Sequence, residues 1–238
     1  RHDEALLKTV FEALGQLLAD YRFIWIPLLR EEWVRDHLEP ALSTFPNLPI
    51  IRERAPNHFV DLTAQSDFES YLNGAVGAKT RKSLRYNTRQ LEQLGQAEYV
   101  TYRTPDDLLR FEVEMQSIEK VSWKGRQRVG HLTRVGSGDF FHELMPKLLV
   151  LGQAEITALR VNQMAIAFEI AIRQPGYYGF FHIAYLPDYH KYAPGKQLML
   201  HNIERAMSEG CTEFDFMQGG HDYKQKFCSG SRALMDAF

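Results

Sequence analysis

Residues 155–186 decide the fold, and they read EITALRVNQMAIAFEIAIRQPGYYGFFHIAYL. Apolar side chains recur at every second position along three stretches, which is the period of a β-strand. These stretches are 155–161, 164–173 and 177–186. The links between them, 162–163 and 174–176, are rich in Asn, Pro and Gly and are short enough for hairpins. We therefore predict three antiparallel strands in series.

The middle strand carries a carboxylate on a face of small residues. One face is predicted to hold the bulky side chains Met164, Ile166, Phe168, Ile170 and Ile172. The other face holds alanines and Glu169, and a carboxylate kept from water gains the raised pKa that suits proton removal. Glu169 is therefore the candidate general base, the alternative being a structural carboxylate under a covering helix. A tight turn at 174–176 would place His182 opposite or diagonal to Glu169.

A helix and a further strand follow this meander. Residues 196–209 are predicted as a helix with Gly210 as its C-cap, and 213–217 as a strand. A strand that follows a helical crossover runs parallel to its neighbour, so the sheet is mixed and the fold class α/β. A splay between two such strands can form a ligand slot. The glycine that opens this helix, Gly195, leaves unpaired N–H groups at the helix start, and Lys196 adds a cation, which together suit a phosphate. The alternative is that Pro194-Gly195 is an ordinary helix start.

The chain before this region contains further helices and short strands. Helical periodicity and capping residues predict helices over 6–18, 31–42, 79–95, 104–120 and 140–151. The short stretches 23–26, 58–62 and 97–103 are expected to be strands. Ser66 and Glu69 have the spacing of a capping box, so another helix begins at Ser66. We divide the chain into an N-terminal lobe, 1–95, and a second domain, 96–238.

Composition excludes several classes of protein. The 238 residues are 45% hydrophobic and 24% charged, which is typical of a globular chain and excludes low-complexity and disordered classes. The net charge of -2 gives no overall attraction to nucleic acid or anionic membranes. No stretch is apolar for long enough to span a membrane, and the N-terminus lacks the pattern of a signal peptide. The sparse cysteines fit a reducing cytosol, so a cytoplasmic location is expected. Because the sequence starts at Arg1, we expect it to begin inside a longer protein.

Metal and hydrolase chemistry are not expected. The two cysteines, Cys211 and Cys228, lack the spacing of a zinc site, and the nine histidines form no helical ligand pair. No Gly-x-Ser-x-Gly motif is present. The strongest cationic feature is the run 79–89, which is basic and helical. Such a run could hold phosphates of RNA or an anionic glycan, but it is more commonly a solvated helix face.

Several segments together resemble one known family. Residues 189–195 before the helix, 213–219 after it, and Tyr223-Lys224 resemble GNAT-superfamily acyltransferases of the CelD-like group, which are related to FemABX aminoacyltransferases. The segments 122–124 and 79–89 resemble further features of this family. The chain departs from the family pattern at Gln218, where Arg is usual, and at Gly220-His221-Asp222.

The resemblance implies a GNAT-like fold whose N-terminal lobe is a degenerate, truncated GNAT-like half. It implies an acyl-CoA donor between two splayed strands, with its pyrophosphate at the start of the helix. The residues so implied for the donor are Tyr192, Pro194, Gly195 and Lys196. Those for the substrate are Arg81, Arg85, Trp123, Lys124, His182 and Tyr189. The candidate catalytic residues are Glu169, Asp215, Tyr223 and Lys224.

The implied reaction is N-acyl transfer from acyl-CoA, acetyl-CoA above all, to a primary amine of a small molecule, a sugar or a polysaccharide precursor. Such a transfer also needs a proton for the departing thiolate. That proton could come from any of four tyrosines, Tyr185, Tyr189, Tyr192 and Tyr223. Two alternatives stay open: aminoacyl transfer from a charged tRNA, and an inactive binding module that uses 79–89. Nucleic acid is a partner only under these alternatives, and no oligomeric state is predicted.

Overall fold

The computed structural model describes residues 2–17, 25–42, 50–134, 136–218 and 222–238. The chain forms two compact units: Arg1–His58 with Gln218–Phe238, and Phe59–Met217. The predicted boundary at residue 95 falls inside the second unit, so residues 59–95 fold together with the segment predicted as the acyltransferase domain. That the first 95 residues descend from a second GNAT-like half stays a prediction.

The first unit combines short helices with a three-stranded sheet. Its helices are α1 (His2–Leu17), α2 (Glu31–Trp33), the π-helical turn η1 (Val34–Leu38), α3 (Glu39–Leu42) and α10 (Asp222–Gln225). Its strands are β1 (Ile26–Arg30), most of β2 (Ile51–Asp61) and β8 (Gly230–Ala237), in the order β1-β8-β2. The predicted strand 23–26 lies largely outside the described residues. Val34 and Leu38 pack against Ala237 and form the core of this unit.

The second unit contains the mixed sheet that the sequence predicts. The strands are β3 (Ala97–Tyr102), β4 (Ala154–Val161), β5 (Met164–Gln174), β6 (Tyr177–Tyr185) and β7 (Glu213–Gln218). Their order is β7-β6-β5-β4-β3, and β7 runs parallel to β6 while the others are antiparallel. The predicted antiparallel series and its parallel neighbour are both confirmed.

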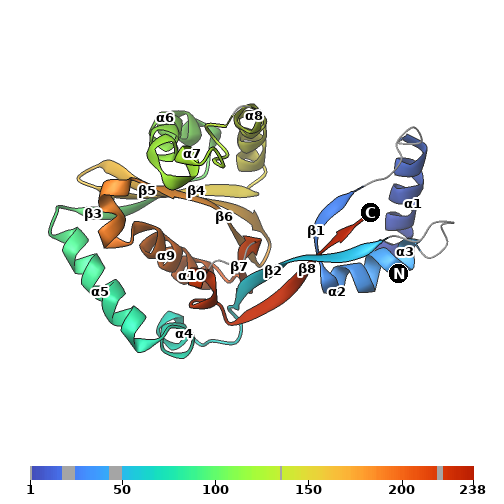
Figure 1. Cartoon of the computed structure of the whole chain (residues 1–238), viewed down its shortest axis with the longest axis horizontal. Coiled ribbons are helices and arrows are strands. Elements are labelled where there is room, and N and C mark those ends of the chain that lie inside the picture. The colour runs from blue at the N-terminus through green and yellow to red at the C-terminus, as the bar shows by residue number, and fades with distance from the viewer. Residues whose placement is uncertain (1, 18–24, 43–49, 135, 219–221) are drawn as a thin grey trace. The chain divides into compact units, whose positions relative to one another are not determined.

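Helices of the second unit cover both faces of this sheet. They are α4 (Phe68–Ala75), α5 (Ala78–Glu92), α6 (Pro105–Val121), α7 (Trp123–Arg126), α8 (Ser137–Val150), the 3-10 turn η2 (Pro187–Tyr192) and α9 (Pro194–Ser208). Figure 1 shows α6, α7 and α8 on one side of β4–β6 and α9 on the other. Among the described residues, no helix is both long and apolar enough to cross a membrane.

A bulge changes the predicted faces of β5. Phe168 and Ile170 pack against α6 and α8, as the alternation predicts. Ile166 lies on the opposite face, in the cluster with Leu91 and Leu198, so its predicted place beside Phe168 is wrong. Leu159 pairs with Ala167 and Arg160 with Ala165, so Ile166 is the extra residue of a bulge in β5, which places it on the other face.

The helix starts follow local side-chain chemistry. The predicted helix start at residue 104 is confirmed, and Thr104 and Asp107 form a reciprocal capping box there. The cap of α4 is Asp67 rather than the predicted Ser66, because the Asp67 carboxylate accepts the Ser70 N–H at 2.7 Å. A carboxylate at this position also benefits from the positive end of the helix dipole.

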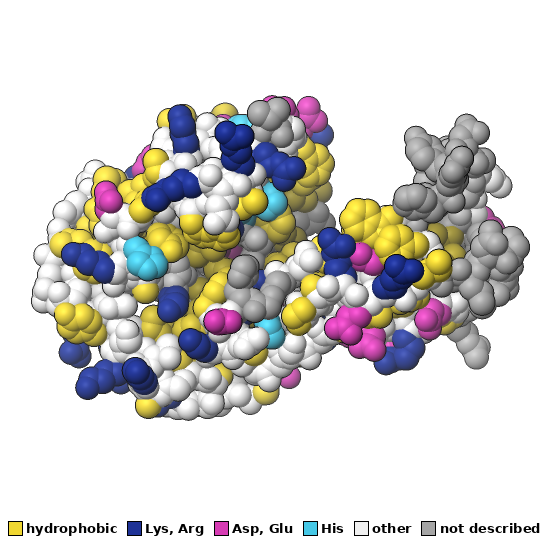
Figure 2. Space-filling view, viewed as in Figure 1, with side chains coloured by type: hydrophobic (Ala, Val, Ile, Leu, Met, Phe, Trp, Pro, Cys, Tyr) yellow, Lys and Arg dark blue, Asp and Glu magenta, His cyan; other side chains and the backbone are white. Residues whose placement is uncertain are grey.

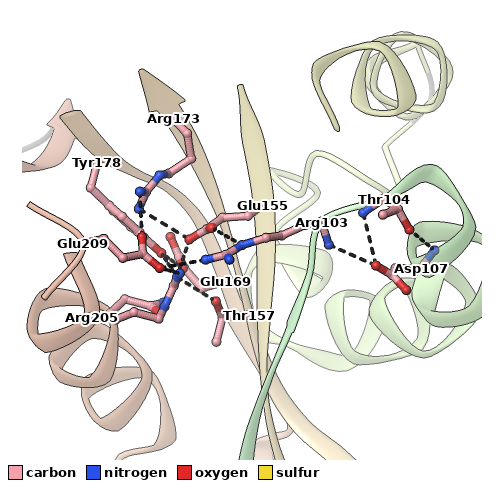
Figure 3. Close-up of polar contacts among 11 residues, drawn as sticks. Arg103, Thr104, Asp107, Glu155, Thr157, Glu169, Arg173, Tyr178, Arg205 and Glu209 are labelled. Atoms are coloured by element: carbon pink, nitrogen blue, oxygen red, sulfur yellow. Dashed lines mark hydrogen bonds and ion pairs between the residues drawn. The ribbon is translucent and has the colours of Figure 1, made fainter. Parts of the chain in front are cut away.

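A cluster of charges fastens the C-terminal half of α9 to the sheet (Figure 3). Arg205 on α9 contacts Glu155 on β4, whose carboxylate also lies 3.1 Å from Arg103. Glu209, just after α9, lies 2.7 Å from both Arg103 and Arg173. Glu155 is 3% exposed, so its charge depends on these guanidinium groups.

Replacing Arg205 by Leu is expected to destabilise the fold. The substitution leaves the buried Glu155 carboxylate with only Arg103 and Arg173, which are farther from it than Arg205 is. We expect the free energy of unfolding to fall by about 3 kcal/mol, as when other buried ion pairs are broken. The free energy of urea unfolding measures this loss. Arg110→Leu is the control, because the Arg110 side chain is 75% exposed and its partner Asp107 is 3.8 Å away. Equal stability of the two variants would show that the cluster does not hold α9.

Candidate functional site

The parallel strands β6 and β7 pair along only part of their length. Their register joins Tyr177 to Glu213, Tyr178 to Phe214 and Gly179 to Asp215, and it includes no later residue of the described chain. Both strands continue beyond these pairs, β6 to Tyr185 and β7 to Gln218. The pair is therefore open at its C-terminal end, which is where a ligand can approach two parallel strands.

The side chain of Asp215 accounts for this opening. Its Oδ1 accepts the N–H of Met217 at 2.6 Å, and its Oδ2 accepts the Tyr177 hydroxyl at 3.1 Å. Met217 has a φ of 59°, a left-handed conformation that is uncommon for residues other than glycine. Because the Met217 N–H points to its own strand's Asp215, it does not extend the pairing with β6. The predicted catalytic residue Asp215 thus has a structural role in β7, and a catalytic role stays a prediction.

The first turn of α9 packs against the unpaired part of β6. Ala193, the residue before the helix, has a left-handed φ of 52°, and Pro194 occupies the first helical position. A Cβ on Gly195 would lie 3.2 Å from the Ile183 Cδ1 and 3.5 Å from the Tyr185 Cδ1. The absence of this atom lets the helix start approach the strand closely.

The four residues predicted to bind the donor lie together at this helix start. Tyr192 precedes the helix, and its carbonyl accepts the Gln197 side-chain amide at 2.7 Å. Pro194, Gly195 and Lys196 are the first three residues of α9. Pro194 has no N–H, and the Lys196 N–H donates to the Ala193 carbonyl at 3.0 Å. The Gly195 N–H, together with the positive end of the helix dipole, is therefore the first-turn group that can favour an anion.

A buried carboxylate lies on the other face of the sheet, near the end of α6. The Glu119 side chain has no exposed surface, and its oxygens accept the backbone N–H groups of His131, Leu132 and Thr133 at 2.7–3.2 Å. The Thr133 hydroxyl donates at 2.8 Å, and Nε2 of His182 lies 2.7 Å away. Glu119 is therefore held from several sides.

Electrostatics keeps Glu119 ionised and His182 neutral. Burial by itself raises the pKa of Glu119, but the close contact with the His182 ring and the hydrogen bonds from Thr133 outweigh it and lower the pKa to about 2. Burial lowers the pKa of His182 to about 4, although Glu119 opposes this shift. Lys124 on α7 completes the group, with Nζ 3.1 Å from Nδ1 of His182. The structure thus brings together two of the predicted substrate-binding residues, His182 and Lys124.

Glu119 is not among the residues predicted for the site. The sequence feature that could have indicated it is the glycine-containing polar loop after α6. In the structure, a Cβ on Gly130 in this loop would lie 2.5 Å from the Glu119 Oε2. Only a glycine there lets the backbone of the following residues wrap the carboxylate. Gly125 is similarly constrained, since a Cβ would lie 2.2 Å from the Glu119 carbonyl oxygen.

Glu169 and His182 lie on opposite faces of the sheet. In the register, Glu169 faces Ile183 and His182 faces Ile170, with a shift between Ile170 and Ala171. The predicted opposite or diagonal approach of the two side chains is therefore wrong, because His182 points toward α6 while Glu169 points toward α9. The shift in register is the physical reason.

The Glu169 carboxyl is enclosed beneath α9 (Figure 3). It has no exposed surface, and it accepts the Tyr178 hydroxyl at 2.8 Å and the Asn202 side-chain amide. Burial raises its pKa well above the ordinary value, although the Tyr178 hydrogen bond acts in the other direction. These contacts are those of a structural carboxyl, and a role as general base stays a prediction.

The basic helix forms one wall of a groove. The groove has a volume of about 470 Å³ between α4, α5 and α9, and Arg81, Arg85 and Arg89 line it. Arg81 also donates to the carbonyls of Leu72 and Val76 at the end of α4, so it has a structural role. Figure 2 shows basic side chains gathered over α4 and α5.

The other predicted site residues are placed as follows. Trp123, on α7, is 44% exposed, and its ring centroid lies 5.9 Å from Nζ of Lys124. Tyr189 packs in η2 beside Tyr192. Tyr223 and Lys224 lie in α10 of the first unit. Lys224 is buried and donates to the Gln218 carbonyl at 2.7 Å, while burial raises the pKa of Tyr223 to about 12. The Tyr223 hydroxyl therefore keeps its proton at neutral pH.

Comparison with known families identifies the class of protein. Residues 78–225 match the family model of the acetyltransferase (GNAT) domain, which covers more than half of the chain. The chain therefore belongs to this family and is an acyltransferase, and the resemblance seen in the sequence is confirmed. No group of three or more metal-ligating side chains occurs in the described part of the chain.

Several solved structures share the fold. The C-terminal domain of a putative lysylphosphatidylglycerol synthetase from Agrobacterium fabrum has a TM-score of 0.63 at 13% identity, covering 90% of this chain and 66% of that one. L-PGS from Bacillus licheniformis has a TM-score of 0.64 at 15% identity, with coverages of 96% and 72%. FemX has a TM-score of 0.66 at 10% identity, with coverages of 98% and 76%. Among curated proteins no sequence matches.

The burial of neutral His182 makes the stability depend on pH. As pH falls from the ordinary histidine value of about 6.5 towards 4, the unfolded chain takes up a proton that folded His182 resists. This residue therefore costs the fold about 3 kcal/mol at pH 4 relative to pH 7. In His182→Gln this part of the loss is absent, so urea unfolding of the variant changes less over that range. The exposed His142→Gln is the control, and an unchanged pH dependence in His182→Gln contradicts the prediction.

Proposed function

We propose that this acyltransferase moves an acyl group from acyl-CoA, acetyl-CoA in the first place, to a primary amine. The observation that carries the proposal is the open end of the β6/β7 pair with the glycine turn of α9 packed beside it. A narrow thioester arm fits between two strands that stop pairing, and a diphosphate fits the first turn of a helix. The Lys196 ammonium adds a positive charge at the same turn.

The reaction needs three further contributions from the chain. The acceptor amine must lose a proton, the negative charge on the acyl oxygen must be stabilised, and the thiolate must gain a proton. We assign Lys124 and His182 to the substrate side of the opening, because both lie on the α6 face next to β6. The resemblance supports an acceptor of the sugar or polysaccharide-precursor class.

An aminoacyl donor is the second candidate. The Agrobacterium fabrum domain belongs to a protein named for lysylphosphatidylglycerol synthesis, and its fold matches this chain over 90% of its length. A shared fold alone does not select the donor. A donor screen that contains both acetyl-CoA and an aminoacyl-adenosine analogue distinguishes the two candidates, since a bound ligand raises the apparent stability of the folded state.

Acetyl-CoA is expected to raise the melting temperature, and Gly195→Val is expected to reduce this rise. A branched side chain at Gly195 presses on Ile183 and Tyr185 and crowds the N–H groups of the first turn. The quantity to compare is the shift caused by the donor, because the substitution also changes the starting stability. Differential scanning fluorimetry over a series of donor concentrations measures it.

Gly77→Val is the matched control for this experiment. Gly77 is the N-cap of another helix, α5, and a Cβ on it would meet no heavy atom within 4 Å. The control should keep the full donor shift. An equal melting shift in both variants would show that the donor does not bind at the start of α9. If acetyl-CoA causes no melting shift in the unmodified protein, the acyl-CoA proposal is overturned.

Glu169→Gln decides between the two roles of this carboxyl. The glutamine keeps an oxygen that accepts from Tyr178 and Asn202, so as a structural group we expect it to retain turnover within about tenfold. Loss of a general base would instead lower turnover by roughly 10²–10⁴-fold. Release of free thiol from acetyl-CoA in the presence of an amine panel measures the rate, and donor binding by melting shift shows that the variant is folded.

A further inference from the structure

Glu119, His182 and Lys124 form a line of contacts through three elements. Glu119 comes from the last turns of α6, His182 from β6 and Lys124 from α7. Nε2 of His182 is 2.7 Å from the Glu119 Oε1, and Nδ1 is 3.1 Å from Nζ of Lys124. Glu119 and His182 have no exposed side-chain surface, and only Lys124 reaches toward the exterior.

The chemistry of the three groups fixes where the protons lie. An ammonium group only donates hydrogen bonds, so Nδ1 of His182 must accept from Lys124. A neutral imidazole then carries its proton on Nε2, which faces the Glu119 carboxylate. The Nε2–H of His182 makes no hydrogen bond of regular geometry, because it does not point directly at the Glu119 Oε1. The carboxylate is the only charged acceptor within reach of that N–H among the described residues.

The Glu119 carboxylate cannot turn away from His182 without loss. Three backbone N–H groups and the Thr133 hydroxyl hold its two oxygens. Gly130 lets the loop approach, because any larger residue there would collide with Oε2. A carboxylate held in this way sets the orientation of the imidazole, as a fixed carboxylate does for a catalytic histidine.

The contacts from Glu119 through His182 to Lys124 lead to the part of β6 that is not paired with β7. His182 lies on β6 beyond Gly179, the last residue of β6 in the register with β7. Lys124 approaches β6 from the α7 side, where the Trp123 ring packs near its ammonium. The ammonium is thus held beside the stretch of β6 that the proposed acyl donor would contact.

We propose that Glu119 is a positioning residue for acyl transfer: acting through His182, it fixes the Lys124 ammonium where negative charge develops on the acyl group. The inference rests on the proposed function. A cation that is oriented before the reaction stabilises that charge without the cost of reorganisation. Lys124 needs no change of protonation for this, and His182 stays neutral throughout.

The other groups facing His182 do not supply this charge. The His131 ring centroid is 5.0 Å away, and burial lowers the pKa of His131, with Lys124 as the next cause. Phe168 on β5 and Phe181, which stacks on His131, are apolar. Lys124 is the cation that touches His182, so the path from Glu119 leads to it.

A double-mutant cycle tests the proposal. Glu119→Gln and Lys124→Met should each lower the rate of thiol release from acetyl-CoA by about 10²-fold, the loss expected for one stabilising group. The double variant should lose about the same 10²-fold rather than 10⁴-fold, because the residues act as one unit. The melting shift with acetyl-CoA should be unchanged in all three variants. Glu114→Gln, on the same helix but paired with Arg160, is the control and should keep the full rate.

Nitrogen NMR of the His182 ring gives a readout that does not depend on turnover. The unmodified protein should show the proton on Nε2, Lys124→Met should shift the Nδ1 resonance, and Glu119→Gln should shift the Nε2 resonance while the proton stays on Nε2. A proton on Nδ1 in the unmodified protein overturns the proposal, as do additive rate losses. Absence of any acetyl-CoA shift overturns the proposed function and the catalytic part, while the NMR result still decides whether Glu119 positions Lys124.

Discussion

A backbone N–H makes one good hydrogen bond, and the opening between β6 and β7 depends on which acceptor the Met217 N–H uses. The Asp215 carboxylate accepts this N–H and also accepts the Tyr177 hydroxyl. Beyond Asp215, β7 no longer pairs with β6. The opening of the β6/β7 pair follows from that separation, and the first turn of α9 packs beside it at Gly195.

Sequence patterns predict what is local and periodic. The strands of residues 155–186 are visible because apolar residues alternate, and the start of α6 is visible because Thr104 and Asp107 are near neighbours. The bulges at Ile166 on β5 and Phe181 on β6 are not visible, since an extra residue in one strand is defined only by its partner. They decide the faces of Ile166 and His182, and there the prediction was wrong.

The candidate site shows the same limit. Pro194-Gly195 and Lys196 are contiguous, so their place at a helix start could be predicted, and the structure groups them there. Glu119 could not be found in this way, because its partners come from a distant strand and from a loop whose path depends on Gly130. In the sequence it is one of many carboxylates on an amphipathic helix.

The two ends of α9 are held in different ways. Arg205 and its carboxylate partners fasten the rear of the helix to the sheet, whereas its first turn presents backbone groups beside β6. Under the proposed function, substitutions at the front turn would change which donor is accepted, while the Arg205 cluster still holds the rear of the helix to the sheet. Such an arrangement separates the residues that hold the fold from those that evolution can alter, so that one scaffold can accept different donors.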